Sequence, residues 1–319
     1  MSGSAASPQS RGGALVLRGI GFSVVGYFLF SLQDATIKWL ASGFTSPQIL
    51  FMRSVVVVPF CLVLFGPGVA PRALVSPMRF RLLLRSVVIV IAWAFYYTAA
   101  RYLQLAELVT LYFSSPLLVA ALAPIILKEH VTWSRWLSVG IGFAGVIVAV
   151  QPTHLNQPVP ILLALAAAAL WAYTSILIRQ VVAAASTAVV MFVSNLTILA
   201  VCGALMPWLW QSLTWQQLAL MLLVGCFGMG GQFMSTEAIR LAPASVVAPI
   251  SFSSLVWAFL LGFAIWGDVP DVAVFVGAGL ILLSGLVVTG AEFWTLRHGR
   301  RELTIPDQAV SSADRTRLP

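Results

Sequence analysis

Long apolar runs dominate the pattern of hydrophobic and polar positions along this chain. A helix of roughly 20 apolar residues crosses the hydrocarbon core of a bilayer, because each residue adds about 1.5 Å to a core about 30 Å thick. Turn-forming and helix-breaking residues separate the runs, as at 42–47, 66–68, 151–152 and 267–270. The pattern predicts an all-α membrane protein with ten transmembrane helices, at 19–40, 47–66, 82–101, 104–127, 132–150, 159–178, 187–208, 216–238, 243–266 and 271–291.

Composition supports this class and excludes others. Hydrophobic residues make up 60% of the 319 residues and charged residues 9%, whereas soluble domains have roughly 45–50% and 25%. The three cysteines all lie inside apolar runs, in no disulfide or zinc-binding spacing. No phosphate-binding loop and no nucleophile–base set is present, so we expect no enzyme, no cofactor, no metal and no ATP-driven transport.

The basic residues indicate how the chain lies in the membrane. Its net charge is +8, but the basic residues are dispersed through short loops, so we expect no nucleic-acid partner. With the N-terminus inside, 15 of the 18 Lys and Arg residues fall on the cytoplasmic side and two on the outer side, while Arg53 lies within a span. The positive-inside rule therefore predicts a multi-pass protein of the cell inner membrane, with residues 1–17 and 292–319 as cytoplasmic tails.

The two halves of the chain resemble each other. A shift of 139 residues aligns 101–129 with 240–268, and it places Phe113-Ser114-Ser115 on Phe252-Ser253-Ser254. A shift of 141 places Phe51 on Phe192. We interpret residues 18–150 and 157–291 as two repeats of five helices. An odd number of spans in each repeat inverts the second relative to the first, with a substrate site expected near the midplane.

Several short motifs carry a resemblance to a known family. In chain order they are Asp34-Ala35-Thr36-Ile37-Lys38, Arg53-Ser54, Tyr97 to Leu103, Ser115-Pro116, Glu129 and Gly140 to Gly145. The chain resembles the drug/metabolite transporter superfamily, specifically its ten-helix bacterial branch with two EamA-type repeats. The resemblance implies alternating-access transport of small organic solutes, mostly efflux and often coupled to protons. Ser194-Asn195 stands where the first half has Arg53-Ser54, so functions carried by these charges are expected of the first half only.

Charged residues within or at the ends of spans are the first candidates for function, since an unpaired charge at bilayer depth costs at least roughly 2.5–3.5 kcal/mol. They are predicted to lie together in the outer half of the membrane, with an Asp34–Arg53 contact. We assign coupling or gating to Asp34, Arg53, Glu107 and Lys38. The structural alternative is that Lys38 and Arg101 reach the interface and one buried pair fixes helix order. Glu129 and Asp268 are each expected to cap the helix that follows.

Aromatic residues far from the predicted interfaces form the second set of candidates. Aromatic walls with hydroxyl partners suit a planar or zwitterionic solute, although the same residues could serve only helix packing. The predicted substrate-binding residues are Tyr27, Trp93, Tyr96, Tyr112, Trp171 and Trp257.

Three functions remain open from the sequence. The first is proton-coupled export of a small polar metabolite of the amino-acid-like or opine-type metallophore class. The second is uptake of a cofactor-like solute such as riboflavin or S-adenosylmethionine. The third is a membrane scaffold without transport, for which a larger soluble domain would be expected. The expected partners are a small-molecule substrate and the lipid bilayer, and the sequence leaves a homodimer open.

Overall fold

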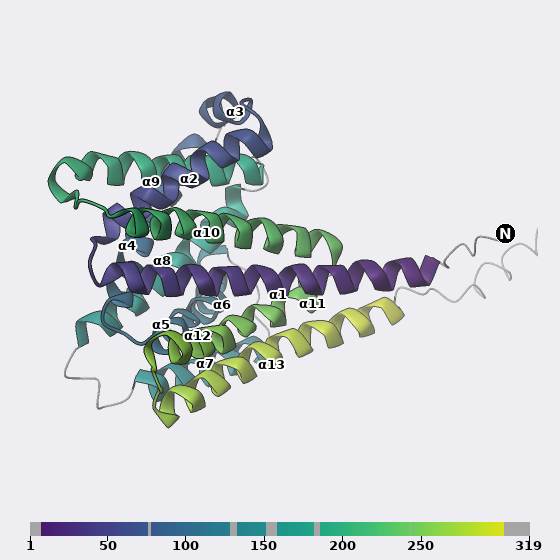
Figure 1. Ribbon diagram of the computed structural model, residues 1–319. Helices are drawn as coiled ribbons and strands as arrows, with labels where there is room; N and C mark the ends of the chain where they lie inside the picture. Colours follow the sequence, from purple (N-terminus) through teal and green to yellow (C-terminus); the bar gives the residue numbers. More distant parts are fainter. Residues whose placement is uncertain are drawn as a thin grey trace, which may run out of the picture.

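The computed structural model describes residues 8–75, 78–127, 133–150, 158–181, 186–242 and 244–302, and these contain helices and no strand (Figure 1). The helices of the first half are α1 (Pro8–Ala41), α2 (Ser46–Phe65), α3 (Val69–Val75), α4 (Arg79–Ala100), α5 (Leu105–Tyr112), α6 (Ser114–Leu127) and α7 (Trp133–Val150). Those of the second half are α8 (Pro158–Val181), α9 (Thr187–Leu209), α10 (Trp215–Leu241), α11 (Ala244–Val247), the 3-10 helix η2 (Ala248–Phe252), α12 (Ser253–Trp266) and α13 (Val272–Glu302). Every predicted span has a helical counterpart, and α3 is an additional helix in a predicted loop.

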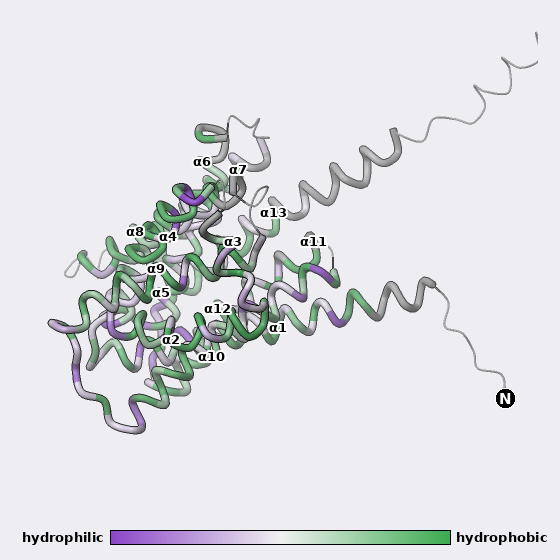
Figure 2. Tube along the Cα trace, turned by 90° about the horizontal axis from the view of Figure 1, so that it is seen from above, coloured by the Kyte–Doolittle hydropathy of each residue, from purple (hydrophilic) through white to green (hydrophobic). Residues whose placement is uncertain are grey.

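The helices form a membrane bundle. Eight helical stretches in the described part of the chain are long and apolar enough to cross a membrane, and Trp136–Val150 and Val272–Val287 are shorter apolar helices. Hydrophobic residues run along the helices while hydrophilic ones occupy short stretches (Figure 2). Many large apolar side chains are exposed, and Trp208 (80%) and Trp215 (86%) lie exposed at helix ends, as interfacial residues do. The prediction of an all-α membrane protein is confirmed.

The first and last helices extend beyond the predicted spans. Helix α1 begins at Pro8 and α13 ends at Glu302, so both continue into segments predicted as tails. These two ends lie on the same side of the bundle (Figure 1), which we name the terminal side; the opposite side is the distal side. That the terminal side faces the cytoplasm stays a prediction.

Helix packing follows an approximate two-fold symmetry between the halves. Helix α1 packs along α10, and the equivalent pair, α8 with α4, packs in the same way. Equivalent helices also meet each other: α2 contacts α9, and α7 contacts α13. Because each half has five spans, the symmetry axis lies in the membrane plane, and the repeats are inverted as predicted.

Small residues allow the closest of these approaches, between α7 and α13. A Cβ atom on Gly145 would lie 2.7 Å from the carbonyl oxygen of Gly277, and one on Gly277 would lie 2.7 Å from the Cβ of Ala149. The two backbones are therefore in direct contact, which only glycine permits at these positions.

The fourth and ninth spans are both interrupted near the centre of the bundle. Phe113 separates α5 from α6, and Phe252 ends η2 before α12 begins. These are the residues that the repeat alignment placed on each other, and their rings stack with centroids 5.3 Å apart. The two breaks meet where the halves join, which is where inverted-repeat transporters place their solute sites.

Candidate functional site

A cavity of about 540 Å³ lies between the two halves. Seven of the ten predicted site residues line it, namely Tyr27, Asp34, Arg53, Trp93, Tyr96, Tyr112 and Trp171. Trp257 does not line the cavity; its ring packs edge-on against Phe28, with centroids 4.9 Å apart. Helices of both repeats contribute to the walls, so a solute bound here touches both halves.

Aromatic rings form one wall of the cavity. Trp93 on α4 lies at its centre, with ring centroids 5.8 Å from Tyr96, 5.6 Å from Tyr97 and 5.5 Å from Trp171 on α8. Tyr112 on α5 completes the set, 4.9 Å from Tyr96. All these pairs are tilted or edge-to-face, the arrangement that aromatic quadrupoles favour. The result is an aromatic box that presents ring faces and hydroxyls to a solute.

Asp34 and Arg53 face this box from α1 and α2. The Asp34 carboxylate has the Tyr96 hydroxyl as its hydrogen-bonding partner and interacts electrostatically with Arg53. Asp34 and Arg53 are in neither of the ion pairs found between described residues, Lys38–Asp268 and Arg240–Glu237. The guanidinium of Arg53 instead lies over the Trp93 ring, 4.9 Å from its centroid. The predicted direct contact is thus replaced by two opposite charges that share one cavity.

Several buried polar atoms around Arg53 are incompletely satisfied. Within the described part of the chain, Nε and Nη1 of Arg53, Oε1 of Gln33 and the hydroxyl of Tyr97 have no hydrogen bond of good geometry, and the Tyr97 hydroxyl interacts only weakly with Arg53 and Gln33. Gly228 makes room for this group, because a Cβ there would overlap Oε1 of Gln33. Buried donors of this kind are costly unless a ligand or water satisfies them. An oxygen ligand with negative charge would satisfy the guanidinium best.

Arg85 is a further cavity residue, which was not among the predicted site residues. The structure places it within α4, only 9% exposed, where Nη1 donates a hydrogen bond of 3.0 Å to Oγ of Ser194. A helical stripe could have revealed it, since Arg85, Ile89, Trp93 and Tyr96 recur on one face of the same helix.

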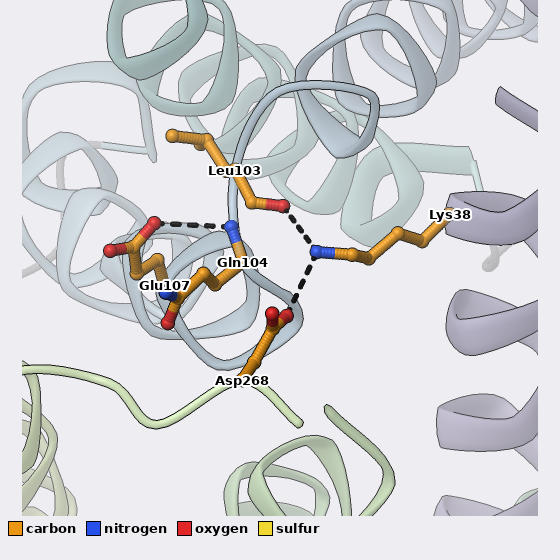
Figure 3. Close-up of polar contacts among 5 residues, drawn as sticks. All are labelled: Lys38, Leu103, Gln104, Glu107 and Asp268. Carbon is orange, nitrogen blue, oxygen red and sulfur yellow. Dashed lines mark hydrogen bonds and ion pairs between the residues drawn. The ribbon is translucent and has the colours of Figure 1, made fainter. Parts of the chain in front are cut away.

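Lys38 connects the two repeats at the distal side. Its Nζ donates to Oδ2 of Asp268 at 3.2 Å and to the carbonyl oxygen of Leu103 at 2.9 Å (Figure 3), and it lies 5.1 Å from the Trp266 ring centroid. Gly267 ends α12 with φ +70°, and the turn places the Asp268 amide on the carbonyl of Gly262. We call the contact between Lys38 and Asp268 the distal latch. The expected role of Asp268 as a helix cap is replaced by this cross-repeat ion pair.

A second contact, besides the distal latch, joins the two repeats at the distal side. The fully buried side chain of Gln48 on α2 donates to the carbonyl of Gln211 at 2.8 Å and accepts from its amide at 3.1 Å. Gln211 lies in the connection between α9 and α10. Both halves are therefore joined at the distal side.

The remaining predicted charges lie apart from the cavity. Glu107 accepts a hydrogen bond of 3.1 Å from the backbone amide of Gln104 in a capping box that begins α5 (Figure 3). Arg101 is exposed, with its guanidinium over Tyr102. Of the five charges expected in one outer cluster, Asp34 and Arg53 thus lie at the cavity, Lys38 in the latch, Glu107 at a helix start and Arg101 on the surface. Glu129, the other expected helix cap, lies outside the described residues.

The cavity leads toward the terminal side. A smaller cavity of about 310 Å³ shares Met191, Met229 and Gln232 with the first, and it continues along α10 to Glu237 and Arg240. Since α10 runs from the distal to the terminal side, the described conformation is closed distally and leads terminally. In the described residues, no group of three or more His, Cys, Asp or Glu side chains could hold a metal ion.

Two inverted repeats around an aromatic-walled cavity that is closed on one side are the architecture of a membrane transporter. Residues 17–151 and 159–290 each match the profile of the EamA-like transporter family, and the chain belongs to this family. This confirms the resemblance to the drug/metabolite transporter superfamily and identifies a transporter rather than an enzyme.

Characterised relatives differ in solute and direction. The chain is 26% identical to an S-adenosylmethionine uptake transporter of Rickettsia conorii, over 86% of this chain and 94% of that one. It is 25% identical to the pseudopaline exporter CntI of Pseudomonas aeruginosa, over 86% and 97%. A solved crystal structure of a protein shares 16% identity, covers 84% of this chain and 96% of its own, and has a TM-score of 0.57. That likeness supports the fold alone.

Proposed function

We propose that this protein exports a small zwitterionic metabolite of the amino-acid-like class across the inner membrane, in exchange for protons. The observation that carries the proposal is the placement of Asp34 and Arg53 on one aromatic-walled cavity between the repeats. A zwitterion offers one group to each charge, so both protein charges are compensated when the cavity is occupied.

Each end of such a solute has a defined partner. Its carboxylate binds the unpaired Nε and Nη1 of Arg53, with Tyr97 and Gln33 as neighbouring polar groups. Its ammonium group binds the Asp34 carboxylate beside the ring faces of Tyr96 and Trp93. The apolar part lies against Tyr112 and Trp171.

Proton exchange follows from competition at one carboxylate. Asp34 is the only acidic residue among the described residues that line the cavity. A buried carboxylate needs either a proton or a cationic partner. The solute cation and a proton then compete for the Asp34 carboxylate. If only one of them can occupy it at a time, the solute crosses the membrane in one direction and the proton in the other, which is the requirement for antiport.

Uptake of an S-adenosylmethionine-like solute is the second candidate. The similarity to a Rickettsia uptake transporter supports it, and an aromatic box with one carboxylate suits a sulfonium cation. Direction is the distinguishing property. In a deletion strain analysed for cells and medium separately, retention of a zwitterionic solute in the cells supports export, whereas its failure to enter from the medium supports uptake.

The experiment that tests coupling uses the purified full chain in proteoliposomes. Flux of the solute found in the strain comparison should rise when a pH gradient drives protons in the direction opposite to the solute. Asp34→Asn should abolish this rise. Arg101→Ala, at an exposed arginine outside the cavity, should leave it unchanged. Arg53→Ala should lower solute affinity roughly 10-fold or more, the cost of a charged hydrogen bond. Flux that ignores the gradient in the unmodified protein contradicts proton exchange.

A further inference from the structure

The charges that line the cavity do not balance. Arg53 and Arg85 are its two basic residues in the described part of the chain, and Asp34 is its one acidic residue. The formal charge is thus two positive against one negative, or +1. A zwitterion that satisfies Asp34 and Arg53 leaves the positive charge of Arg85 in place.

Arg85 is held in the cavity rather than at the interface. Arg79 and Arg81, on the first turn of the same helix, are exposed, as arginines that set topology are. Arg85 is buried instead, its Nη1 is bound to Ser194, and its Nε has no hydrogen-bond partner in the described structure. A neutral hydroxyl does not compensate a buried guanidinium, so an anionic partner is missing.

The repeat symmetry relates the position that Arg85 contacts, Ser194, to the position of Arg53. The alignment that places Phe51 on Phe192 also places Arg53 on Ser194. The second repeat lacks its own arginine there, yet Arg85 brings a guanidinium to within 3.0 Å of Ser194. The cavity therefore has a cation near each of two symmetry-related positions, one supplied by α2 and the other by α4.

The two cations are separated along α4. Arg53 rests on Trp93, and Arg85 lies eight residues before Trp93, which corresponds to about 12 Å along the helix axis at about 1.5 Å per residue. Ile89 lies between them on the cavity wall. Two acidic groups set apart along the cavity suit this spacing better than a single small carboxylate does.

We propose that the transported solute carries two acidic groups, separated by several bonds, in addition to its cationic group, and that Arg85 binds the second acid. This inference rests on the proposed function and narrows its solute class to amino-acid derivatives with two carboxylates. S-adenosylmethionine, which has one carboxylate and two cationic centres, leaves Arg85 without a partner. The site accordingly favours a solute with two acidic groups over an S-adenosylmethionine-like solute, and the direction of transport is left to the strain comparison.

The test uses α-aminodicarboxylates of increasing length as probes. Binding of glutamate, 2-aminoadipate, 2-aminopimelate and 2-aminosuberate to the purified full chain is measured by calorimetry, together with the ω-amide of each. The amides keep the length and one carbonyl acceptor but lose the second charge. Arg85→Ala is compared with Arg81→Ala, which removes an exposed charge from the same helix.

We expect affinity to increase with chain length and the longest acids to bind roughly 10-fold or more tightly than their amides. This difference should disappear in Arg85→Ala and persist in Arg81→Ala. Two results would overturn the role of Arg85 and leave the proposed function standing. One is equal binding of acid and amide by the unmodified protein, and the other is a preference for the acid that persists in Arg85→Ala. Failure of every acid and every amide to bind contradicts both. The comparison within the unmodified protein needs no variant to fold.

Discussion

Breaking the distal latch should change which side of the membrane the cavity faces. Lys38 and Asp268 belong to different repeats, and their side chains are only 14% and 21% exposed. Lys38→Met retains most of the length of the side chain but removes the charge, the 3.2 Å ion pair with Asp268 and the 2.9 Å hydrogen bond to Leu103. These contacts join the two repeats on the closed side, and opening that side would separate them, so the substitution should favour the distally open state.

The burial of the latch sets how far the equilibrium between the distally closed and distally open states should shift. Exposed ion pairs contribute about 0.2–1 kcal/mol, and removing one partner of a fully buried pair costs about 3–5 kcal/mol. With most of both side chains buried and a carbonyl and the Trp266 ring as additional partners, we expect about 1–3 kcal/mol. Such a difference changes the ratio of two conformations by about 5–150-fold.

Spin labels can measure this ratio. Cysteines replacing Ser42 and Val269, both exposed at the distal side, would carry the labels, with exposed Cys226 replaced by serine. The inter-label distance distribution should gain a longer component in Lys38→Met. Arg240→Gln is the matched control, since it breaks an exposed ion pair with Glu237 within one helix. The same distribution in both variants would refute the latch.

Two further predictions concern glycines at close approaches. Gly277→Val should lower the free energy of unfolding by about 1–3 kcal/mol, because a side chain there meets the backbone of Gly145; Gly279→Val, where a Cβ meets nothing within 4 Å, should not. Thermal unfolding of the two variants checks this, and equal melting temperatures would argue against the backbone contact. Gly228→Ala should displace Gln33 from Arg53 and weaken solute binding without loss of folding. Unchanged affinity in calorimetry would show that Gln33 has no part in the site.

Sequence patterns predicted the architecture because bilayer thickness leaves few solutions for an apolar chain. All ten spans have helical counterparts, and the repeat alignment correctly paired Phe113 with Phe252, which stack at the centre. The extensions of α1 and α13 were missed, since a helix can continue into water beyond the apolar stretch that predicts it.

The sequence predicted which residues belong to the candidate site, but not which residues they contact. A charge or a Trp at bilayer depth stands out in a sequence, and so Asp34, Arg53, Trp93 and Trp171 were selected, all of which line the cavity. Partners depend on tertiary contacts between distant segments. Lys38 and Asp268 are 230 residues apart, and no local spacing could join them.

The symmetry of the fold and the asymmetry of its charges have different roles in transport. Equivalent helix pairs give two conformations related by exchange of the repeats, which is the structural basis of alternating access. Were the cavity charges symmetric as well, a solute would meet the same site in either orientation. Arg53 lies at one of the two symmetry-related positions, and Ser194, with Arg85 of the first repeat bound to it, lies at the other, so the two positions present different groups to the cavity. If the solute carries two acids, as proposed above, one whose acids differ in their neighbours would be held in one orientation throughout the exchange, and the cavity would select for an unsymmetrical molecule.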